Sequence, residues 1–481
     1  MHDIPKPNKI LVAISVAIAG LITVLLAQWL ISDHGDAHGH AAHMPHYWGI
    51  GIMPFLAILG SIALLPLIPA THLWWESNAN RFFVAMLCAG ATILYLFLTH
   101  KEDIGPSLNH AIMQDYIPFI ILLFSLYVIA GGIHLSGDLE ATPLTNTSFL
   151  AVGSIIASFV GTTGASMLLI RPILKTNSQR KHIIHTVVIF IFLVSNIGGT
   201  LLPIGDPPLF LGYLRGVDFL WTLNLWPMWA TTCGILLVVY YIWDSILWRK
   251  EGDLSHLKDD LQVHPIRVSG LINFVYIGGI VVAAAIIDTN KTLPFTEWKP
   301  FPYLRELVML AFVGLSLVST SKAIKTANNF TYGAILEVAA LFSGIFIAMQ
   351  VPLTILRASG EAITATLNQP WQYFWATGSL SSFLDNAPTY VVFFKLAQSL
   401  PSDQVMEVND GSVPIALLVA ISLGAVFMGA MTYIGNGPNF MVKAIAEQEG
   451  VKMPSFFGYM FKYSIPVLVP IFILVTILFL L

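Results

Sequence analysis

Long apolar stretches separated by short polar segments follow one another along most of this 481-residue chain. About 20 apolar residues cross a lipid bilayer as a helix, so each stretch of roughly that length predicts a membrane span. The stretches without an internal break are residues 10–31, 48–67, 82–99, 116–135, 221–243, 270–287, 307–320, 332–356 and 456–481. This pattern predicts an all-α polytopic membrane protein.

Four further apolar stretches are interrupted by glycine, proline or polar residues. They are residues 149–170, 183–214, 371–396 and 413–442. The second and fourth are too long for one simple span. The first and third can each cross the bilayer once, or can enter and return as a re-entrant hairpin.

Composition agrees with lipid as the main solvent. Hydrophobic residues make up 56% of the chain and charged residues 10%, whereas a soluble domain carries about 25% charge. No basic block indicates a nucleic-acid partner. Cys88 and Cys233 both lie in apolar stretches, so a disulfide framework is not expected.

The positions of lysine and arginine decide between the two topologies, because cytoplasmic loops are enriched in both residues. With both short interrupted stretches re-entrant, 16 of the 23 Lys and Arg residues fall in cytoplasmic loops. The other arrangements weaken or reverse this asymmetry. We therefore expect eleven transmembrane helices plus two re-entrant hairpins in a bacterial-type inner membrane, with the N-terminus cytoplasmic and the C-terminus outside.

Two short motifs recur in the same order in the second half of the chain. Leu123-Phe124-Ser125 returns as Leu341-Phe342-Ser343, and Ile204-Gly205-Asp206-Pro207-Pro208 returns as Ile434-Gly435-Asn436-Gly437-Pro438. Under the predicted topology the copies enter from opposite faces. The sequence thus predicts two inverted repeats, which in transporters meet at a midplane binding site. The expected division is 1–47 (first span and outer loop), 48–247 (first repeat), 248–267 (cytoplasmic linker) and 268–481 (second repeat).

The break between Ser195 and Pro208 carries the most informative polar residues. Three prolines and three glycines oppose a continuous helix there, and irregular backbone at membrane depth survives where it is buried or lines water. Its carbonyls, with the oxygens of Ser195, Asn196 and Thr200, suit a hard cation such as Na⁺. Asp206 precedes Pro207, so it either caps the following helix or binds an ion, and these roles are compatible.

The matching break in the second repeat has an amide where the first has an acid. Asn436 aligns with Asp206, and Thr432 and Asn439 flank it. One interpretation is a Gly-Pro helix break with Asn caps. We favour a second wall of the same site, because the two halves are broken at matching positions.

The tips of the two interrupted short stretches complete the predicted site. Asp385 and Asn386 lie at one tip, and Thr162 and Thr163 lie at the other. Ionisable groups inside a membrane are functional by default, although Asp385 can also act as a simple cap for the returning helix. Glu337, early in its span, is either a proton site or a residue that reaches to the interface.

Several other polar residues receive a plainer interpretation. The outer loop holds a histidine tract that either binds metal weakly or, as we favour, is solvated: His34, His38, His40, His43 and His46. We expect His182 and His185 to be interfacial, and the acidic residues between 244 and 260 to be solvated.

The stretch Ser195–Pro208 resembles the SNIGGT…IGDPP signature of the arsenite permease and NhaD-type sodium/proton antiporter branch of the ion transporter superfamily. That superfamily also includes the citrate and dicarboxylate/sodium symporters. Leu384-Asp385-Asn386-Ala387-Pro388 resembles the LDN-x-P motif of that branch. The likeness covers most of residues 116–442 and implies the eleven-span, two-hairpin fold, an elevator-type motion and a homodimer. The Ser-Asn-Thr motifs of the related dicarboxylate symporters are not repeated, since Ile197 follows Asn196.

Two functions remain open from the sequence. In sodium/proton antiport, Asp206 and Asp385 would bind H⁺ and Na⁺ alternately. In cation-coupled uptake of citrate or a dicarboxylate, helix N-termini at the breaks would attract the anion. We favour antiport because the expected site carries acids and no nearby Lys or Arg. The expected partners are small ions or a small organic anion and the lipid bilayer, with Na⁺ transported or coupling and no other cofactor. No zinc-ligand cluster or Ser/His pair at membrane depth indicates an enzyme.

Overall fold

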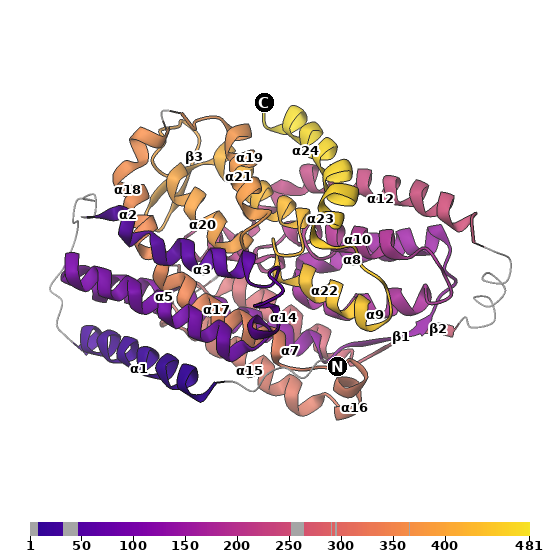
Figure 1. Ribbon diagram of the computed structural model, residues 1–481, viewed down its shortest axis with the longest axis horizontal. Helices are drawn as coiled ribbons and strands as arrows, with labels where there is room; N and C mark the ends of the chain where they lie inside the picture. Colours follow the sequence, from indigo (N-terminus) through magenta and orange to yellow (C-terminus); the bar gives the residue numbers. More distant parts are fainter. Residues whose placement is uncertain (1–7, 32–46, 252–263, 290, 294–295, 365) are drawn as a thin grey trace.

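The computed structural model describes residues 8–31, 47–251, 264–289, 291–293, 296–364 and 366–481. Helices account for most of these residues (Figure 1). Six of the described helices are long and apolar enough to cross a membrane, and α17 (Gly333–Ala348) and α18 (Gln350–Thr364) form a further candidate span bent by 40°. Shorter apolar helices are Trp48–Leu64, Ile184–Thr200, Ile272–Ile286 and Ile415–Met431. The total of eleven spans stays a prediction.

The N-terminal helices form a layer along one side of the molecule (Figure 1). Its helices are α1 (Lys9–Ile31), α2 (Trp48–Gly51), α3 (Met53–Leu64), α4 (His72–Trp75) and α5 (Asn78–Thr99). Helix α5 packs against α1, α3 and α17 (Gly333–Ala348). A Cβ atom at Gly344 of α17 would overlap the backbone of Ala85, so this glycine lets α5 and α17 approach closely.

The described part of the first half contains helices, a short strand and several short 3₁₀- or π-helical segments. They are η1 (Lys101–Asp103), α6 (Ile104–Leu108), η2 (Asn109–Tyr116), α7 (Ile117–Ala130), β1 (His134–Asp138), α8 (Pro143–Val160), α9 (Thr162–Thr176), α10 (Ile184–Leu193), η3 (Ile197–Thr200), η4 (Pro203–Gly205), α11 (Pro207–Leu214), η5 (Phe219–Leu225) and α12 (Trp226–Trp248).

The second half begins with a strand and contains the same kinds of broken helix. Its elements are β2 (His264–Ser269), α14 (Ile272–Ile286), α15 (Leu304–Ser319), α16 (Lys322–Ala327), α17, α18 (Gln350–Thr364), α19 (Pro370–Ser381), α20 (Asn386–Ala397), β3 (Val405–Val408), β4 (Gly411–Pro414), α21 (Ile415–Met428), η6 (Gly429–Met431), α22 (Gly437–Gln448), α23 (Phe456–Tyr459), η7 (Met460–Ser464) and α24 (Ile465–Phe479).

All four predicted interruptions are breaks between helices. Helices α8 and α9 meet at Gly161, whose φ of +81° favours glycine. Helices α19 and α20 are separated by residues 382–385, α10 and α11 by η3 and η4, and α21 and α22 by η6 and residues 432–436. Whether the first two pairs are re-entrant in the bilayer stays a prediction.

The two long breaks are built alike. In the first, a Cβ atom at Gly205 would overlap the Gly199 carbonyl; in the second, a Cβ atom at Gly435 would lie 2.6 Å from the Gly429 oxygen. Each loop therefore folds back on itself through a glycine pair six residues apart. Both loops also contact a serine of the neighbouring broken pair: Gly205 approaches Ser158, and Gly435 approaches Ser381.

Two details of the sequence prediction are wrong. The fold is not strictly all-α, because β1 pairs with β2 and β3 with β4 in two small antiparallel sheets. The span predicted for 116–135 ends at Ala130, where Gly131 and Gly132 leave the helix and β1 follows. The start of β1 pairs with the end of β2: His134 lies opposite Ser269, which is 135 residues later in the chain.

Candidate ion and substrate site

Asp206 is the centre of the candidate site. It precedes α11 and its side chain is buried, with 1% of the residue exposed. Its Oδ1 accepts hydrogen bonds from Thr162 Oγ1 at 2.8 Å and Asn436 Nδ2 at 3.0 Å, and its Oδ2 accepts one from Asn386 Nδ2 at 2.7 Å. The side chain makes no capping bond to its own helix, so of the two interpretations left open by the sequence, side-chain capping does not occur.

The three donors come from the starts of three other helices. Thr162 is the first residue of α9, Asn386 is the first residue of α20, and Asn436 directly precedes α22. Both tips and both long breaks therefore converge on one carboxylate. The two residues aligned by the internal repeat, Asp206 and Asn436, bond directly to each other.

The surroundings of Asp206 neutralise none of its negative charge. All three donors are uncharged, and within the described part of the chain no Lys, Arg or His forms an ion pair with it. A buried carboxylate without a counterion is costly unless it takes up a cation or a proton. Such a group is chemically suited to bind Na⁺ or H⁺.

A chain of asparagines connects the two long breaks behind Asp206. Asn436 Nδ2 also lies 3.2 Å from Asn196 Oδ1 and 3.1 Å from the Ser195 carbonyl. Asn196 Nδ2 donates to Asn439 Oδ1 at 2.7 Å, and Asn439 Nδ2 donates to the Gly429 carbonyl at 2.8 Å. These bonds join the Ser195 backbone and the Asn196 side chain of the first break to Asn436 and Asn439 of the second half.

An unused acceptor lies beside the carboxylate. Asn386 is fully buried, and its Oδ1 has no hydrogen-bond partner among the described residues, while its Nδ2 holds Asp206. Buried polar atoms are rarely left without a partner. The amide oxygen and the Asp206 carboxylate together offer oxygen ligands of the kind that Na⁺ prefers.

Asp385 caps a helix and also lines a cavity. Its carboxylate Oδ1 accepts from the Ala387 backbone at 3.1 Å, so it caps α20 as the plainer interpretation expected. It also lines a cavity of about 280 Å³ together with Thr163, Glu337 and Asn436. The cavity thus extends from the network around Asp206 to a second carboxylate.

Arg81 was missed by the sequence analysis and corrects one of its statements. Its Nη1 lies 2.9 Å from Glu337 Oε2, and both residues line the 280 Å³ cavity with Asp385. A cationic side chain is therefore present near the broken segments, contrary to expectation. The available signal was a lone arginine in the first turn of an otherwise apolar helix.

The remaining predicted residues shape the loops around the site. Thr200 Oγ1 bonds the Ile197 carbonyl of its own turn at 2.6 Å, and Thr432 Oγ1 bonds the Ser382 carbonyl. Ser195 shares a 2.7 Å hydroxyl contact with Ser166 of α9. The predicted histidine tract, His34, His38, His40, His43 and His46, lies outside the described residues.

The expectations for Asp244 and His185 are wrong. Asp244 is fully buried near the end of α12, where Arg180 Nη2 lies 2.7 Å and His185 Nε2 lies 2.8 Å from its Oδ1. Asn146 Nδ2 adds a bond at 3.4 Å. Helix α12 extends five residues beyond the predicted span, which places Asp244 inside the protein, where the charge of Arg180 compensates it.

The chain as a whole is similar in sequence to known proteins. A family model described as "Putative citrate transport" matches residues 41–480. The chain belongs to this family. Together with its long apolar helices, this match shows an integral membrane protein, and it confirms the part of the resemblance that pointed to the citrate transporter family.

Three bacterial proteins illustrate the similarity. An uncharacterized transporter of Synechocystis sp. is 25% identical over 307 residues, covering 59% of this chain and 65% of that protein, slightly under two thirds of its length. Uncharacterized transporters of Mycobacterium bovis and Mycobacterium tuberculosis are each 24% identical over 422 residues, covering 81% of this chain and 91% of theirs.

Proposed function

We propose that the protein is a secondary active transporter that exchanges sodium for protons, with Asp206 as the shared binding group. The observation that carries this proposal is the buried Asp206 carboxylate, held by three uncharged donors from three other helix starts. One carboxylate that either a proton or a sodium ion can neutralise couples the opposite movements of the two ions. The unused Asn386 Oδ1 is the proposed second ligand for sodium.

In the proposed transporter, this site lies between two inverted repeats. In it, α8–α9 and α19–α20 are re-entrant hairpins, and the chain crosses a bacterial inner membrane eleven times with the N-terminus in the cytoplasm. Asp385 and Glu337 line the cavity beside Asp206 and give a route along which cations reach it. A homodimer completes the proposal, by resemblance to the ion transporter superfamily.

A second candidate function is cation-coupled uptake of citrate or a related carboxylate. The family description favours it, and so does Arg81 on the cavity wall. Helices α20 and α22 also begin beside the cavity, and helix N-termini attract anions. In this function a cation at Asp206 would offset the repulsion between the site's acids and the substrate.

Reconstitution in proteoliposomes separates the two functions. For antiport, added Na⁺ or Li⁺ dissipates an imposed pH difference, Asp206→Asn abolishes the response, and the exposed-site control Asp403→Asn keeps it. For carboxylate uptake, labelled citrate accumulates with a Na⁺ or H⁺ gradient, and Arg81→Gln abolishes that accumulation. An Asp206→Asn protein that retains either activity at the wild-type rate contradicts the assignment of Asp206.

A further inference from the structure

A second, larger cavity lies away from the ion site. It has a volume of about 750 Å³ and is enclosed by β1, the C-terminal half of α9, residues 177–184, the end of α16 and the loop after α22. It shares no lining residue with the 280 Å³ cavity. Its volume is in the range of small-molecule sites, about 300–1,000 Å³.

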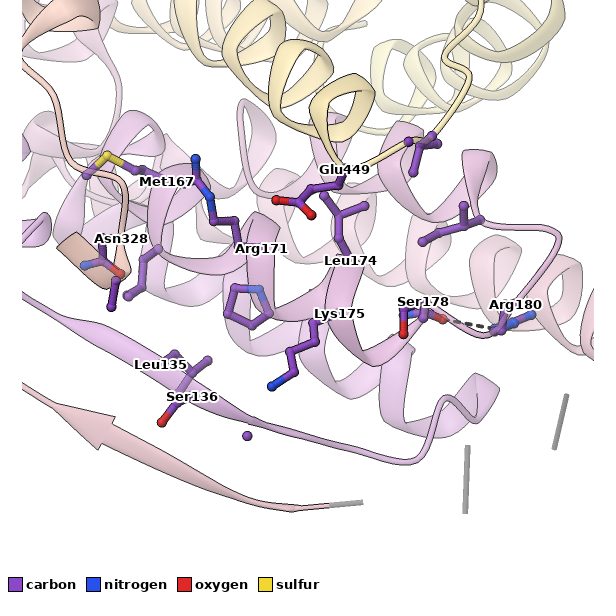
Figure 2. A pocket seen from close by; sticks show the side chains of 18 of the residues that line it. Leu135, Ser136, Met167, Arg171, Leu174, Lys175, Ser178, Arg180, Asn328 and Glu449 are labelled. Atoms are coloured by element: carbon purple, nitrogen blue, oxygen red, sulfur yellow. Dashed lines mark hydrogen bonds between the residues drawn. The ribbon is translucent and has the colours of Figure 1, made fainter. Parts of the chain in front are cut away.

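Basic side chains dominate the charged lining of this cavity. Five Lys or Arg residues contribute to it, against one carboxylate, that of Glu449. The five are Arg171, Lys175, Arg180, Lys181 and Lys452. Figure 2 shows Arg171 and Lys175 on the same helix, with Lys175 extending toward β1 near Ser136.

Most of this positive charge is uncompensated. Arg180 is neutralised by Asp244, whereas the side chains of Arg171, Lys175, Lys181 and Lys452 form no ion pair with any residue that the structure describes. The Nε of Arg171 is buried and has no hydrogen-bond partner among those residues. A buried guanidinium nitrogen without an acceptor is a site that a ligand oxygen can satisfy.

Membrane orientation alone does not account for this arrangement. Positive charges anywhere in a cytoplasmic loop satisfy the charge rule. Here the charges converge on a cavity from α9 and the segment directly after it, and from the loop after α22, which lies far away in the chain. Arg171 lies within helix α9 and not in a loop.

We propose that this cavity binds a multivalent oxyanion, such as a phosphate ester or polycarboxylate in solution or the phosphate headgroup of an anionic lipid. Arg171 and Lys175 of α9 and Lys181 supply the charge-assisted hydrogen bonds, and Lys452, which also lines the cavity, adds positive charge. Met167, Leu168 and Leu174 give the cavity an apolar wall for the rest of the ligand. The site does not depend on which species the transporter carries.

Titration calorimetry of the purified full-length protein with pyrophosphate tests this site. The wild type should bind pyrophosphate saturably. The double variant Lys175→Ala/Lys181→Ala should bind at least tenfold more weakly, because it loses two of the positive charges that line the cavity. Both lysines are exposed, so their loss should leave the fold intact. The matched control, Lys101→Ala/Lys299→Ala, removes the same charge from exposed positions outside the cavity. It should bind within twofold of the wild type.

Nanodiscs of pure phosphatidylcholine and of phosphatidylcholine with phosphatidylglycerol distinguish the two sources. If phosphatidylglycerol weakens pyrophosphate binding to the wild type, the lipid headgroup competes for the site. Unchanged affinity supports a soluble anion. Absence of saturable binding by the wild type in both lipids, or equal weakening in both double variants, overturns the proposal. Arg171→Lys, which keeps the charge but loses the fork of donors, should weaken binding less than the double variant.

Discussion

Substitution of Gly435 by alanine tests whether the folded-back loop holds the ion site together. The added Cβ would lie 2.6 Å from the Gly429 oxygen and 2.8 Å from the Ser381 oxygen, both backbone atoms. Restoring an ordinary carbon–oxygen contact requires a displacement of about 0.8 Å. Asn436 is the next residue, so this movement carries its Nδ2 beyond hydrogen-bond range of Asp206 Oδ1, now 3.0 Å away.

The expected loss follows from the strength of that bond. A hydrogen bond to a charged group contributes about 1.5–3 kcal/mol, and about 1.4 kcal/mol corresponds to a tenfold change in affinity. The lost bond stabilised the ionised carboxylate, and protons compete with Na⁺ for it, so Gly435→Ala should weaken the apparent affinity for Na⁺ by about 10- to 100-fold. The affinity is measured from the Na⁺ concentration that half-dissipates an imposed pH difference in proteoliposomes.

Two further glycines make the test specific. Gly437 has open space where a methyl group would be added, with no neighbouring heavy atom within 4 Å, so Gly437→Ala should keep the wild-type affinity. Gly205 makes the matching contact with Gly199 in the first break, and Gly205→Ala should lower the affinity as Gly435→Ala does. Wild-type affinity in Gly435→Ala, in protein that elutes as a single species, would refute the reasoning.

Two other predictions concern Asp385, which caps α20, and Asp244, which forms a buried ion pair with Arg180. Asp385→Asn keeps a good helix cap, whereas Asp385→Ala removes it at a cost of about 0.5–2 kcal/mol. Only the alanine variant should therefore have a lower unfolding temperature. Both variants should lose ion exchange in proteoliposomes. Equal exchange by Asp385→Asn and wild type would show that Asp385 acts as a cap alone. Asp244→Asn leaves Arg180 buried without its counterion and should destabilise the protein by about 3–5 kcal/mol, seen as a lower unfolding temperature that the exposed-site variant Asp403→Asn does not share.

The positions of the helix breaks were predictable because local chemistry determines them. Pro203, Pro207 and Pro438 lack backbone donors, so they oppose a helix that continues from the preceding residues, and Pro207 and Pro438 stand in the first turns of α11 and α22. Gly161 adopts a positive φ between α8 and α9. The internal repeat also aligned Asp206 with Asn436. That alignment identified two equivalent positions, but it contained no information that their side chains touch.

The contacts between distant segments were not predictable in the same way. Arg81 and Glu337 are 256 residues apart and meet because α5 packs on α17 through Gly344. A sequence pattern reports which face of a helix is apolar, not which other helix covers it. Asp244 was misjudged because its charged neighbours in the chain indicated a loop, while its true partners, Arg180 and His185, lie about 60 residues earlier.

The same limit applied to the strands. β1 and β2 are short and polar, and each depends on the other for its backbone hydrogen bonds. A strand of this kind carries little alternation of apolar and polar residues, so periodicity does not indicate it. The pairing follows instead from where α7 ends and α14 begins.

Direct binding of radioactive sodium to the purified protein tests the central role of Asp206 most directly. At alkaline pH, where protons compete least, the wild type and Asp403→Asn should bind sodium saturably, and Asp206→Asn should bind none above background. Saturable sodium binding by Asp206→Asn at the wild-type affinity would contradict the assignment of this buried carboxylate as the coupling site.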